Sequence, residues 1–181
     1  MLAPVFSPDS TRLLVGDLRG RVQIWSTADW TQQKTLQTSQ QALISMAFSS
    51  DGKRLVTGSG RGGICVWDME TRKMLRKLSS PEVGYLTLSP DDRTLAVGSL
   101  INNVVLWDLE TGKQLQTIDA HSKAVAGVDF SKDGNRLATI SLDGVLRVWD
   151  AASNSEIEQD PKTLSALLRF CLLYTSPSPR D

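Results

Sequence analysis

The sequence repeats itself four times at a nearly constant spacing, and this repetition restricts the fold more than any other feature of the chain. Serines that open a turn motif, Ser-Pro-Asp or a variant of it, follow one another at intervals of 42, 40 and 42 residues, at Ser7, Ser49, Ser89 and Ser131. A tryptophan stands 18 residues after each serine, and these repeat tryptophans are Trp25, Trp67, Trp107 and Trp149. Because the serines and the tryptophans keep the same spacing in all four copies, the sequence indicates one structural unit that occurs four times.

Each copy has the pattern of short strands separated by turns. In the fourth copy, strands are expected at 124–130, 136–140 and 145–149, with a fourth at 155–159. Asp and Gly residues occupy the intervening turns, where they tolerate the required backbone angles. Apolar residues with a helical period do not run through the repeats. The sequence therefore predicts an all-β fold, namely a β-propeller fragment of four four-stranded antiparallel blades.

The repeats resemble those of the WD-repeat (tryptophan–aspartate repeat) family of β-propellers. Three of the four tryptophans are followed by an aspartate, at Asp68, Asp108 and Asp150. Gly-Ser pairs at residues 58–59 and 98–99 add to the resemblance, which covers roughly residues 2–159. It implies a propeller over residues 1–160, with blades at 1–37, 38–78, 79–118 and 119–160.

Many blades of this family contain a buried hydrogen-bonded set of His, Ser or Thr, Asp and Trp. The resemblance assigns these roles in the fourth copy to His121, Thr139, Asp143 and Trp149. Such a set satisfies the polar groups that it buries and stiffens the blade. In the other copies the aspartate position holds Arg19, Arg61 and Ile101, and the histidine position holds Ser39 and Ser79. Those blades are expected to depend on apolar packing and main-chain hydrogen bonds.

The resemblance also implies a partner-binding face, where the first strand of each blade begins beside the second turns. Three positions per copy contribute, which are the residues seven and five before the turn serine and eleven after it. The candidates are Leu18, Ala42, Ile44, Gly60, Glu82, Gly84, Leu100, Ala124, Ala126 and Leu142, with Leu2 as a further position of the first copy. Apart from Glu82 they are small or apolar, which suits a protein or peptide partner. Alternatively, they line the mouth of the propeller and pack on one another.

Composition opposes several other function classes. Twenty basic residues balance twenty acidic ones, so neither nucleic acid nor a membrane surface is an expected partner. One histidine and two distant cysteines, Cys65 and Cys171, exclude a zinc finger and a disulfide framework. The sequence shows neither a signal peptide nor a transmembrane stretch, so a cytoplasmic location is expected. The favoured interpretation is a non-catalytic protein–protein interaction scaffold without cofactor or metal.

Two alternatives stay open. The repeats could form the sensor or regulatory arm of a longer multidomain protein. They could also form a propeller hydrolase with its active site in the central channel. That site would need converging His, Asp, Glu or Asn side chains, whereas the inner first strands supply Ala47, Thr87 and Asp129.

The two ends depart from the repeat. Met1 falls inside the first strand of the first copy, so the four copies are expected to be part of a larger propeller with more blades. Residues 161–181 form a non-repeat tail, in which Pro177 and Pro179 oppose regular structure. From Cys171 onward this tail resembles a translated sequencing adapter, the alternative being a native disordered tail. Because each copy holds its own four strands, we expect an open arc, a dimer that makes an eight-bladed ring, or aggregation.

Overall fold

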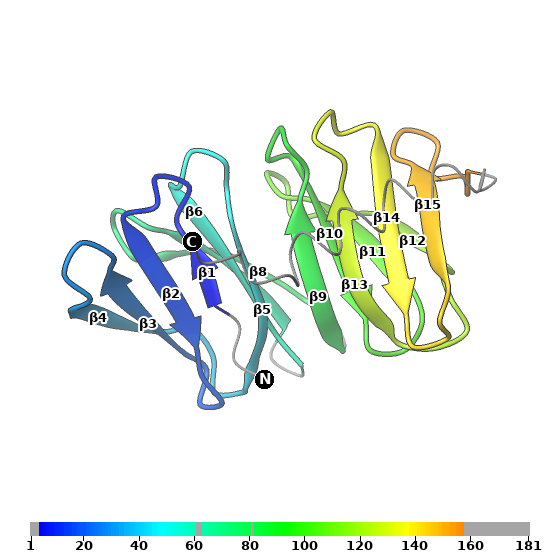
Figure 1. The fold of residues 1–181 in the computed structure, drawn as a ribbon. Helices are drawn as coiled ribbons and strands as arrows, with labels where there is room; N and C mark the ends of the chain where they lie inside the picture. Colours follow the sequence, from blue (N-terminus) through cyan, green and yellow to red (C-terminus); the bar gives the residue numbers. More distant parts are fainter. Residues whose placement is uncertain (1–3, 61–62, 81, 158–181) are drawn as a thin grey trace, which may run out of the picture.

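The computed structural model describes residues 4–60, 63–80 and 82–157. In this part the chain forms fifteen strands and no helix, and the strands make four antiparallel sheets that follow one another along the chain (Figure 1). The all-β prediction and the prediction of a propeller fragment are therefore confirmed. None of the described residues forms a helix with the length and hydrophobicity needed to cross a bilayer.

The first three sheets have four strands each, paired in chain order. Sheet one contains β1 (Pro4–Phe6), β2 (Arg12–Gly16), β3 (Arg21–Ser26) and β4 (Gln32–Gln37). Sheet two contains β5 (Leu43–Phe48), β6 (Arg54–Ser59), β7 (Gly63–Asp68) and β8 (Met74–Leu78). Sheet three contains β9 (Val83–Leu88), β10 (Thr94–Ser99), β11 (Val104–Asp108) and β12 (Gln114–Ile118).

Sheet four differs from the prediction, because its described part has three strands, β13 (Val125–Phe130), β14 (Arg136–Ser141) and β15 (Leu146–Asp150). In place of the fourth strand predicted at 155–159, Glu156 makes a single bridge to Trp149. The turn after β15 extends to Ser155, whose carbonyl accepts a 2.9 Å hydrogen bond from the N–H of Asp150. Two described residues are then left for pairing, and residues 158–181, including the predicted tail, lie outside the described part.

The repeated serines and aspartates build the first turn of each copy. The Ser7 hydroxyl donates to the Asp9 carboxylate at 2.5 Å, and the corresponding pairs of the other copies have distances of 2.5–2.6 Å. The hydrogen bond from Ser7, followed by those from Thr11, lowers the pKa of Asp9 to about 2. In sheet two, the aspartate after the tryptophan, Asp68, accepts from the N–H and hydroxyl of Thr71 in the turn before β8. The local motifs of the repeat are thus turn-forming hydrogen bonds.

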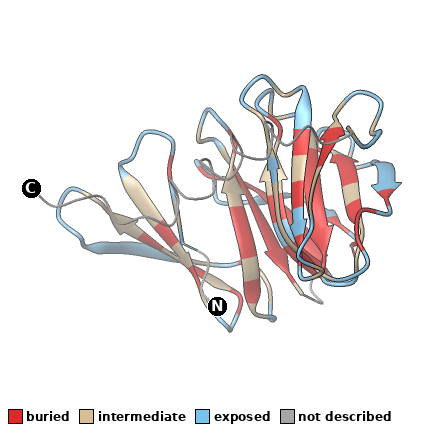
Figure 2. Cartoon of the chain, turned by 45° about the vertical axis from the view of Figure 1, so that its right-hand side comes forward, coloured by how far each residue is buried: buried red, intermediate tan, exposed pale blue. Residues whose placement is uncertain are grey.

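The core lies between neighbouring sheets (Figure 2). We call the side of a sheet that meets the next sheet its leading face, and the side with the repeat tryptophan, which meets the preceding sheet, its trailing face. Between sheets two and three, for example, Val56 of the leading face packs with Leu95 and Trp107 of the trailing face. Equivalent clusters join sheets one and two and sheets three and four. We call each of these three contacts a seam.

Each seam has a glycine at its closest approach, nine residues before the repeat tryptophan. A Cβ atom on Gly16, Gly58 or Gly98 would come 3.0 Å from Leu43 Cβ, 2.6 Å from Val83 Cγ1 and 2.7 Å from Val125 Cγ1, respectively. The missing side chain therefore lets the first strand of the next sheet pack against the backbone. In sheet four this position holds Ile140, which is 42% exposed.

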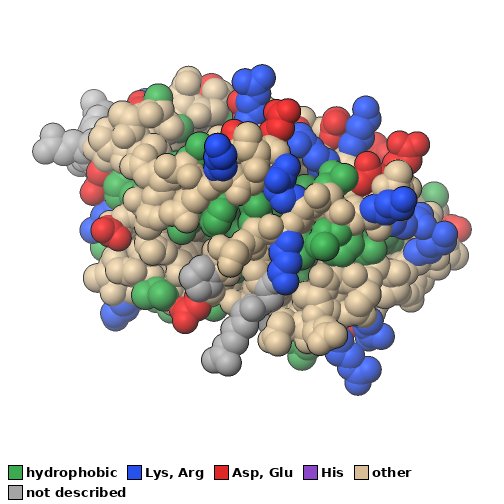
Figure 3. Space-filling model, turned by 180° about the vertical axis from the view of Figure 1, so that it is seen from behind, with side chains coloured by type: hydrophobic (Ala, Val, Ile, Leu, Met, Phe, Trp, Pro, Cys, Tyr) green, Lys and Arg blue, Asp and Glu red, His purple; other side chains and the backbone are tan. Residues whose placement is uncertain are grey.

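The end sheets have one uncovered face each among the described residues. From its second residue onward β10 is buried throughout, whereas buried residues in β14 alternate with more exposed ones. Trp25 of sheet one is half-buried, while the other three repeat tryptophans are buried. On the reverse side of the molecule, apolar side chains lie in small groups between Lys and Arg side chains (Figure 3).

Candidate partner-binding face

The predicted face lies where the turns after β2, β6, β10 and β14 meet the starts of the first strands. The N–H of Leu100 donates to the carbonyl of Glu82 at 3.1 Å, and the N–H of Leu142 donates to the carbonyl of Ala124 at 3.0 Å. The structure therefore brings together turn and strand positions that stand 18 residues apart in the sequence.

Three leucines project from this face at equivalent turn positions. Leu18 is 67% exposed, Leu100 is 45% exposed and Leu142 is 68% exposed. Leu100 extends over Gly84, because a Cβ atom at Gly84 would lie 3.4 Å from Leu100 Cδ2 and 2.7 Å from the Gly98 carbonyl oxygen. The lack of a side chain at Gly84 thus makes room for the Gly98 carbonyl group, while Leu100 lies at an ordinary van der Waals distance.

The other predicted positions form the base of the face. The half-buried members are Ala42, Ile44, Gly60, Ala124 and Ala126, whereas Glu82 is exposed and Gly84 is buried. Gly60 lies beside Ile44, since a Cβ atom there would be 3.1 Å from Ile44 Cδ1. Leu2 lies outside the described residues.

Two exposed apolar side chains near this face were not predicted. Tyr85 follows Gly84 on β9 and is 37% exposed, and Ile101 follows Leu100 in the turn after β10. Two sequence features could have indicated them. Tyr85 is an aromatic residue in a first strand, and Leu100 and Ile101 are consecutive apolar residues in a turn, where polar residues are usual.

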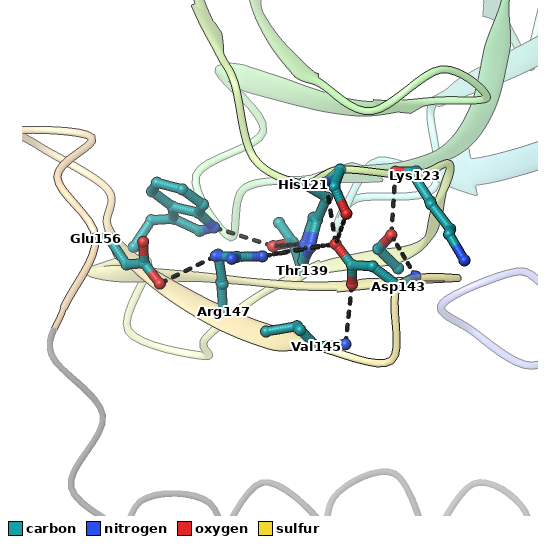
Figure 4. A network of polar contacts seen from close by, with 10 residues as sticks. His121, Lys123, Thr139, Asp143, Val145, Arg147 and Glu156 are labelled. Carbon is teal, nitrogen blue, oxygen red and sulfur yellow. Dashed lines mark hydrogen bonds and ion pairs between the residues drawn. The ribbon is translucent and has the colours of Figure 1, made fainter.

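The predicted polar network of sheet four is brought together beside this face (Figure 4). His121 Nε2 is 2.8 Å from the Thr139 hydroxyl, which also accepts a 3.0 Å hydrogen bond from Trp149 Nε1. His121 Nδ1 lies 3.2 Å from the carboxylate of Asp143. The N–H groups of Ser122 and Val145 also donate to Asp143, at 3.0 Å and 2.9 Å.

Arg147 is a further member, which sequence reasoning missed. Its Nη1 is 2.8 Å from His121 Nδ1, and its Nε is 3.2 Å from a Glu156 carboxylate oxygen. A guanidinium group can only donate, so Nδ1 accepts from Arg147 and the imidazole proton lies on Nε2, which donates to Thr139. His121 is therefore neutral in this arrangement, and burial lowers the pKa of its imidazole.

Asp143 supplies the negative charge of the network. Its burial opposes ionisation, but the hydrogen bonds that the N–H groups of Val145 and Ser122 donate hold the pKa of its carboxyl well below the ordinary value. Arg147 Nη1 lies 3.8 Å from the same carboxylate. Asp143 is thus an ionised acceptor throughout the physiological pH range.

The network also positions the turn that carries Leu142. The Ser141 hydroxyl donates to the Lys123 carbonyl at 3.0 Å and accepts from the N–H of Asp143 at 3.1 Å. Leu142 lies between these two residues, so its backbone is held on both sides. The projecting leucine therefore stands on a rigid turn.

Sheet two corrects the prediction that the other sheets depend on apolar packing and main-chain hydrogen bonds alone. In sheet two, Trp67 Nε1 donates to the Thr57 hydroxyl at 3.1 Å. In sheet three, Val97 occupies the equivalent position, and the buried Nε1 of Trp107 has no hydrogen-bond partner among the described residues. The overlooked signal was a threonine ten residues before the tryptophan, which copies two and four share.

The inner strands hold the residues on which the hydrolase alternative depends. Thr87 donates to a carboxylate oxygen of Asp129 at 3.2 Å, and Ala47 is half-buried within an apolar cluster. Within residues 4–60, 63–80 and 82–157, no group of three or more His, Cys, Asp and Glu side chains is arranged to hold a metal ion.

Comparison with known proteins identifies the repeat. A family model described as "WD domain, G-beta repeat" matches residues 30–68 and 112–150. Each match begins with the last strand of one sheet and ends with the third strand of the next. The chain is also similar to "Guanine nucleotide-binding protein subunit beta-like protein" of Encephalitozoon cuniculi (strain GB-M1), with 49% identity over 37 residues. The aligned segment spans 20% of this chain and 11% of that relative.

Proposed function

Because this chain is built from WD repeats, we propose that it is a non-catalytic interaction module that binds a protein or peptide through the candidate face. The observation that carries the proposal is the projection of Leu18, Leu100 and Leu142 from equivalent turns of three sheets. Large apolar side chains that cluster on an exposed surface are typical of protein-binding sites.

The chemistry of the face favours a partner with apolar side chains. Tyr85 and Ile101 extend the apolar surface beside Leu100, and exposed Glu82 and Lys123 place one acidic and one basic group near it. An apolar centre with a charged rim resembles the usual anatomy of a protein interface. We therefore propose that a short peptide segment with two or more apolar side chains binds across sheets three and four.

The rigidity of the face supports binding, because little conformational entropy is lost when a preorganised surface associates. Leu142 stands on a turn that Ser141 and Asp143 hold. The same network supports a structural role for His121, since Arg147 and Thr139 occupy its two ring nitrogens. Neither nitrogen is left for proton transfer to a substrate.

Selection of peptides against the immobilised protein, followed by affinity measurement, tests the proposal. Truncation of an interface hot spot costs about 2 kcal/mol or more, so Leu100→Asp and Leu142→Asp should each weaken the selected peptides about 30-fold or more. Leu75→Asp and Leu115→Asp are matched controls, because these leucines are similarly exposed but lie on the outer strands β8 and β12. Selected peptides that are insensitive to both face variants, or that need Leu115, would contradict the proposal.

A further inference from the structure

A cavity of about 490 Å³ opens between sheets three and four, at the end of the seam where the first turns lie. Ligand pockets usually have volumes of about 300–1,000 Å³. The lining comes from the first turns of both sheets, from β10, β11 and β13, and from the turn after β15. We propose that this cavity binds an arginine side chain of a partner protein. The site is separate from the candidate face, because β9 and β13 begin at that face and end at the first turns.

Ala151 leaves part of this seam unfilled. Two residues after the repeat tryptophan, sheets two and three carry Met69 and Leu109, which are 4% and 3% exposed and belong to the apolar clusters of their seams. The main chain is the same in all three sheets, since the N–H groups of Met69, Leu109 and Ala151 donate to the equivalent turn carbonyls at 2.8–2.9 Å. The alanine side chain is shorter, so a space that methionine or leucine fills elsewhere stays open.

Thr94 widens the same space from β10. It is the fifth residue after the turn serine, a position that holds Arg12, Arg54 and Arg136 in the other copies. Alternate residues of a strand share a face, so Thr94 lies on the same side as Ala96, which belongs to the apolar cluster between sheets three and four. Of the three leading faces that form seams within the chain, only that of sheet three therefore lacks an arginine at this position.

The balance of charge at this seam changes in the same way. Each seam is bordered by the turn aspartates of its two sheets and by the residues at the positions of Thr94 and Asn135. These sets are Asp9, Asp51, Arg12 and Lys53 at the first seam, Asp51, Asp91, Arg54 and Arg93 at the second, and Asp91, Asp133, Thr94 and Asn135 at the third. Two carboxylates are thus matched by two cations at the first two seams and by none at the third.

Both carboxylates at the cavity are ionised at neutral pH. A hydrogen bond from the turn serine is the largest cause that lowers the pKa of each, to about 2 for Asp133. The charge of Arg93 lowers the pKa of Asp91 further, but this exposed side chain does not line the cavity. Among the ion pairs of the described residues, none includes Asp91 or Asp133. The rim of the cavity therefore attracts a positively charged group.

An arginine side chain matches this combination of charge and surface. Its planar guanidinium presents several donors to carboxylate oxygens and stacks on aromatic rings. Leu106 and Phe130 supply apolar and aromatic surface beside the two carboxylates, and Ala151 leaves room for the methylene stem. A partner would thereby supply at this seam the kind of side chain that the chain itself supplies at the other two.

An NMR titration of the full chain with N-acetyl-arginine amide tests the chemistry of the site. Saturable changes are expected in the backbone amide signals of Thr94, Asn135 and Ala151. N-acetyl-citrulline amide, which has a similar shape without the charge, should leave these signals unchanged. Equal effects of the two probes, changes confined to other parts of the chain, or no changes at all would overturn the cation site.

Two variants that fill the cavity test its location without disturbing the turns. Ala151→Leu introduces the residue that sheet three has at this position, and Thr94→Arg introduces the residue that sheet two has. Each should weaken binding of N-acetyl-arginine amide at least tenfold and leave the melting temperature unchanged or raised. Ala152→Leu, at an exposed position outside the lining, is the matched control and should bind like the wild type. Unchanged binding in the filling variants, or an equal loss in the control, would contradict the assignment.

Peptide selection tests whether the arginine comes from a protein. Selection against the Leu100→Asp, Leu142→Asp double variant removes the candidate face from the competition. The selected peptides should share an arginine and should bind at least tenfold more weakly when Ala151→Leu is added. Peptides without arginine, or peptides insensitive to Ala151→Leu, would overturn the proposal. If N-acetyl-arginine amide bound but no peptide could be selected, the site would belong to a small molecule and a partner protein would be excluded.

Discussion

Arg147 Nη1 lies 2.8 Å from His121 Nδ1, closer than the 3.2 Å that separates the same nitrogen from Asp143. The imidazole therefore accepts from a guanidinium rather than donating to the carboxylate. If Nδ1 were protonated, its N–H would oppose the N–H donor of Arg147 and would donate to the carboxylate of Asp143 instead. The position of Arg147 thus couples the charge of His121 to the arrangement of the network.

We predict that His121 makes the protein less stable as the pH falls below 6.5. Burial lowers the pKa of His121 from its ordinary value of 6.5. The unfolded chain therefore binds the proton at a higher pH than the folded chain, and the stability present above pH 6.5 is lost as the pH falls toward the folded pKa. Urea unfolding at pH 7.5 and 5.5 measures this loss, and turn carboxyls with a pKa of about 2, such as Asp9 and Asp133, stay ionised at both values. His121→Gln should show a smaller pH effect, and an equal effect in both proteins would refute the assignment.

Arg147→Met should raise the pKa of His121. The substitution removes a nearby positive charge and frees Nδ1 to donate to Asp143, so it favours the protonated imidazole. Since His121 is the only histidine of the chain, its ring signals in an NMR titration report this pKa without overlap. Arg136→Met, at an exposed position of β14, is the control and should leave the titration unchanged. An unchanged or lowered pKa in Arg147→Met would show that Nδ1 does not accept from Arg147.

Val97→Thr should stabilise sheet three, because it offers the unpaired Nε1 of Trp107 an acceptor at the position that Thr57 has beside Trp67. The new hydroxyl can itself donate to the Val105 carbonyl, as Thr57 donates to that of Cys65. The expected gain in the free energy of unfolding is about 1 kcal/mol. The reverse change, Thr57→Val, should cost about 1–3 kcal/mol, because it leaves the N–H of Trp67 buried and unpaired. Urea denaturation measures both, and a loss of stability in Val97→Thr would count against this account.

Gly98→Val should destabilise the protein by about 1–3 kcal/mol, since the added side chain overpacks a seam that already holds Val125 at its closest approach. Ile140→Val, at the equivalent and exposed position of sheet four, should change the free energy of unfolding by less than about 0.5 kcal/mol. Thermal unfolding at low protein concentration compares the two. If both substitutions lowered the free energy of unfolding by similar amounts, packing against the next sheet would not be the reason for a glycine at position 98.

The sequence by itself determined the turns and the order of the strands, although the described part of sheet four lacks the fourth strand expected at 155–159. These features depend on residues close together in the chain, such as Ser7 with Asp9 and Asp68 with Thr71, whose hydrogen bonds close a turn wherever the motif occurs. The resemblance to the WD-repeat family assigned His121, Thr139, Asp143 and Trp149 to one network, and the structure brings them together. The same resemblance pointed to the leucines of the candidate face.

Only the tertiary structure decided how the sheets meet and which buried polar groups find a partner. The fit of Gly98 against Val125, the donation from Ser50 to Asp92 and the exposure of Tyr85 depend on contacts between sheets, which no local pattern encodes. The entry of Arg147 into the network and the unpaired Nε1 of Trp107 likewise depend on which side chain lies opposite on a neighbouring strand. Strand patterns repeat because backbone geometry is local, whereas these contacts differ from copy to copy because each is set by the particular side chains that meet in three dimensions.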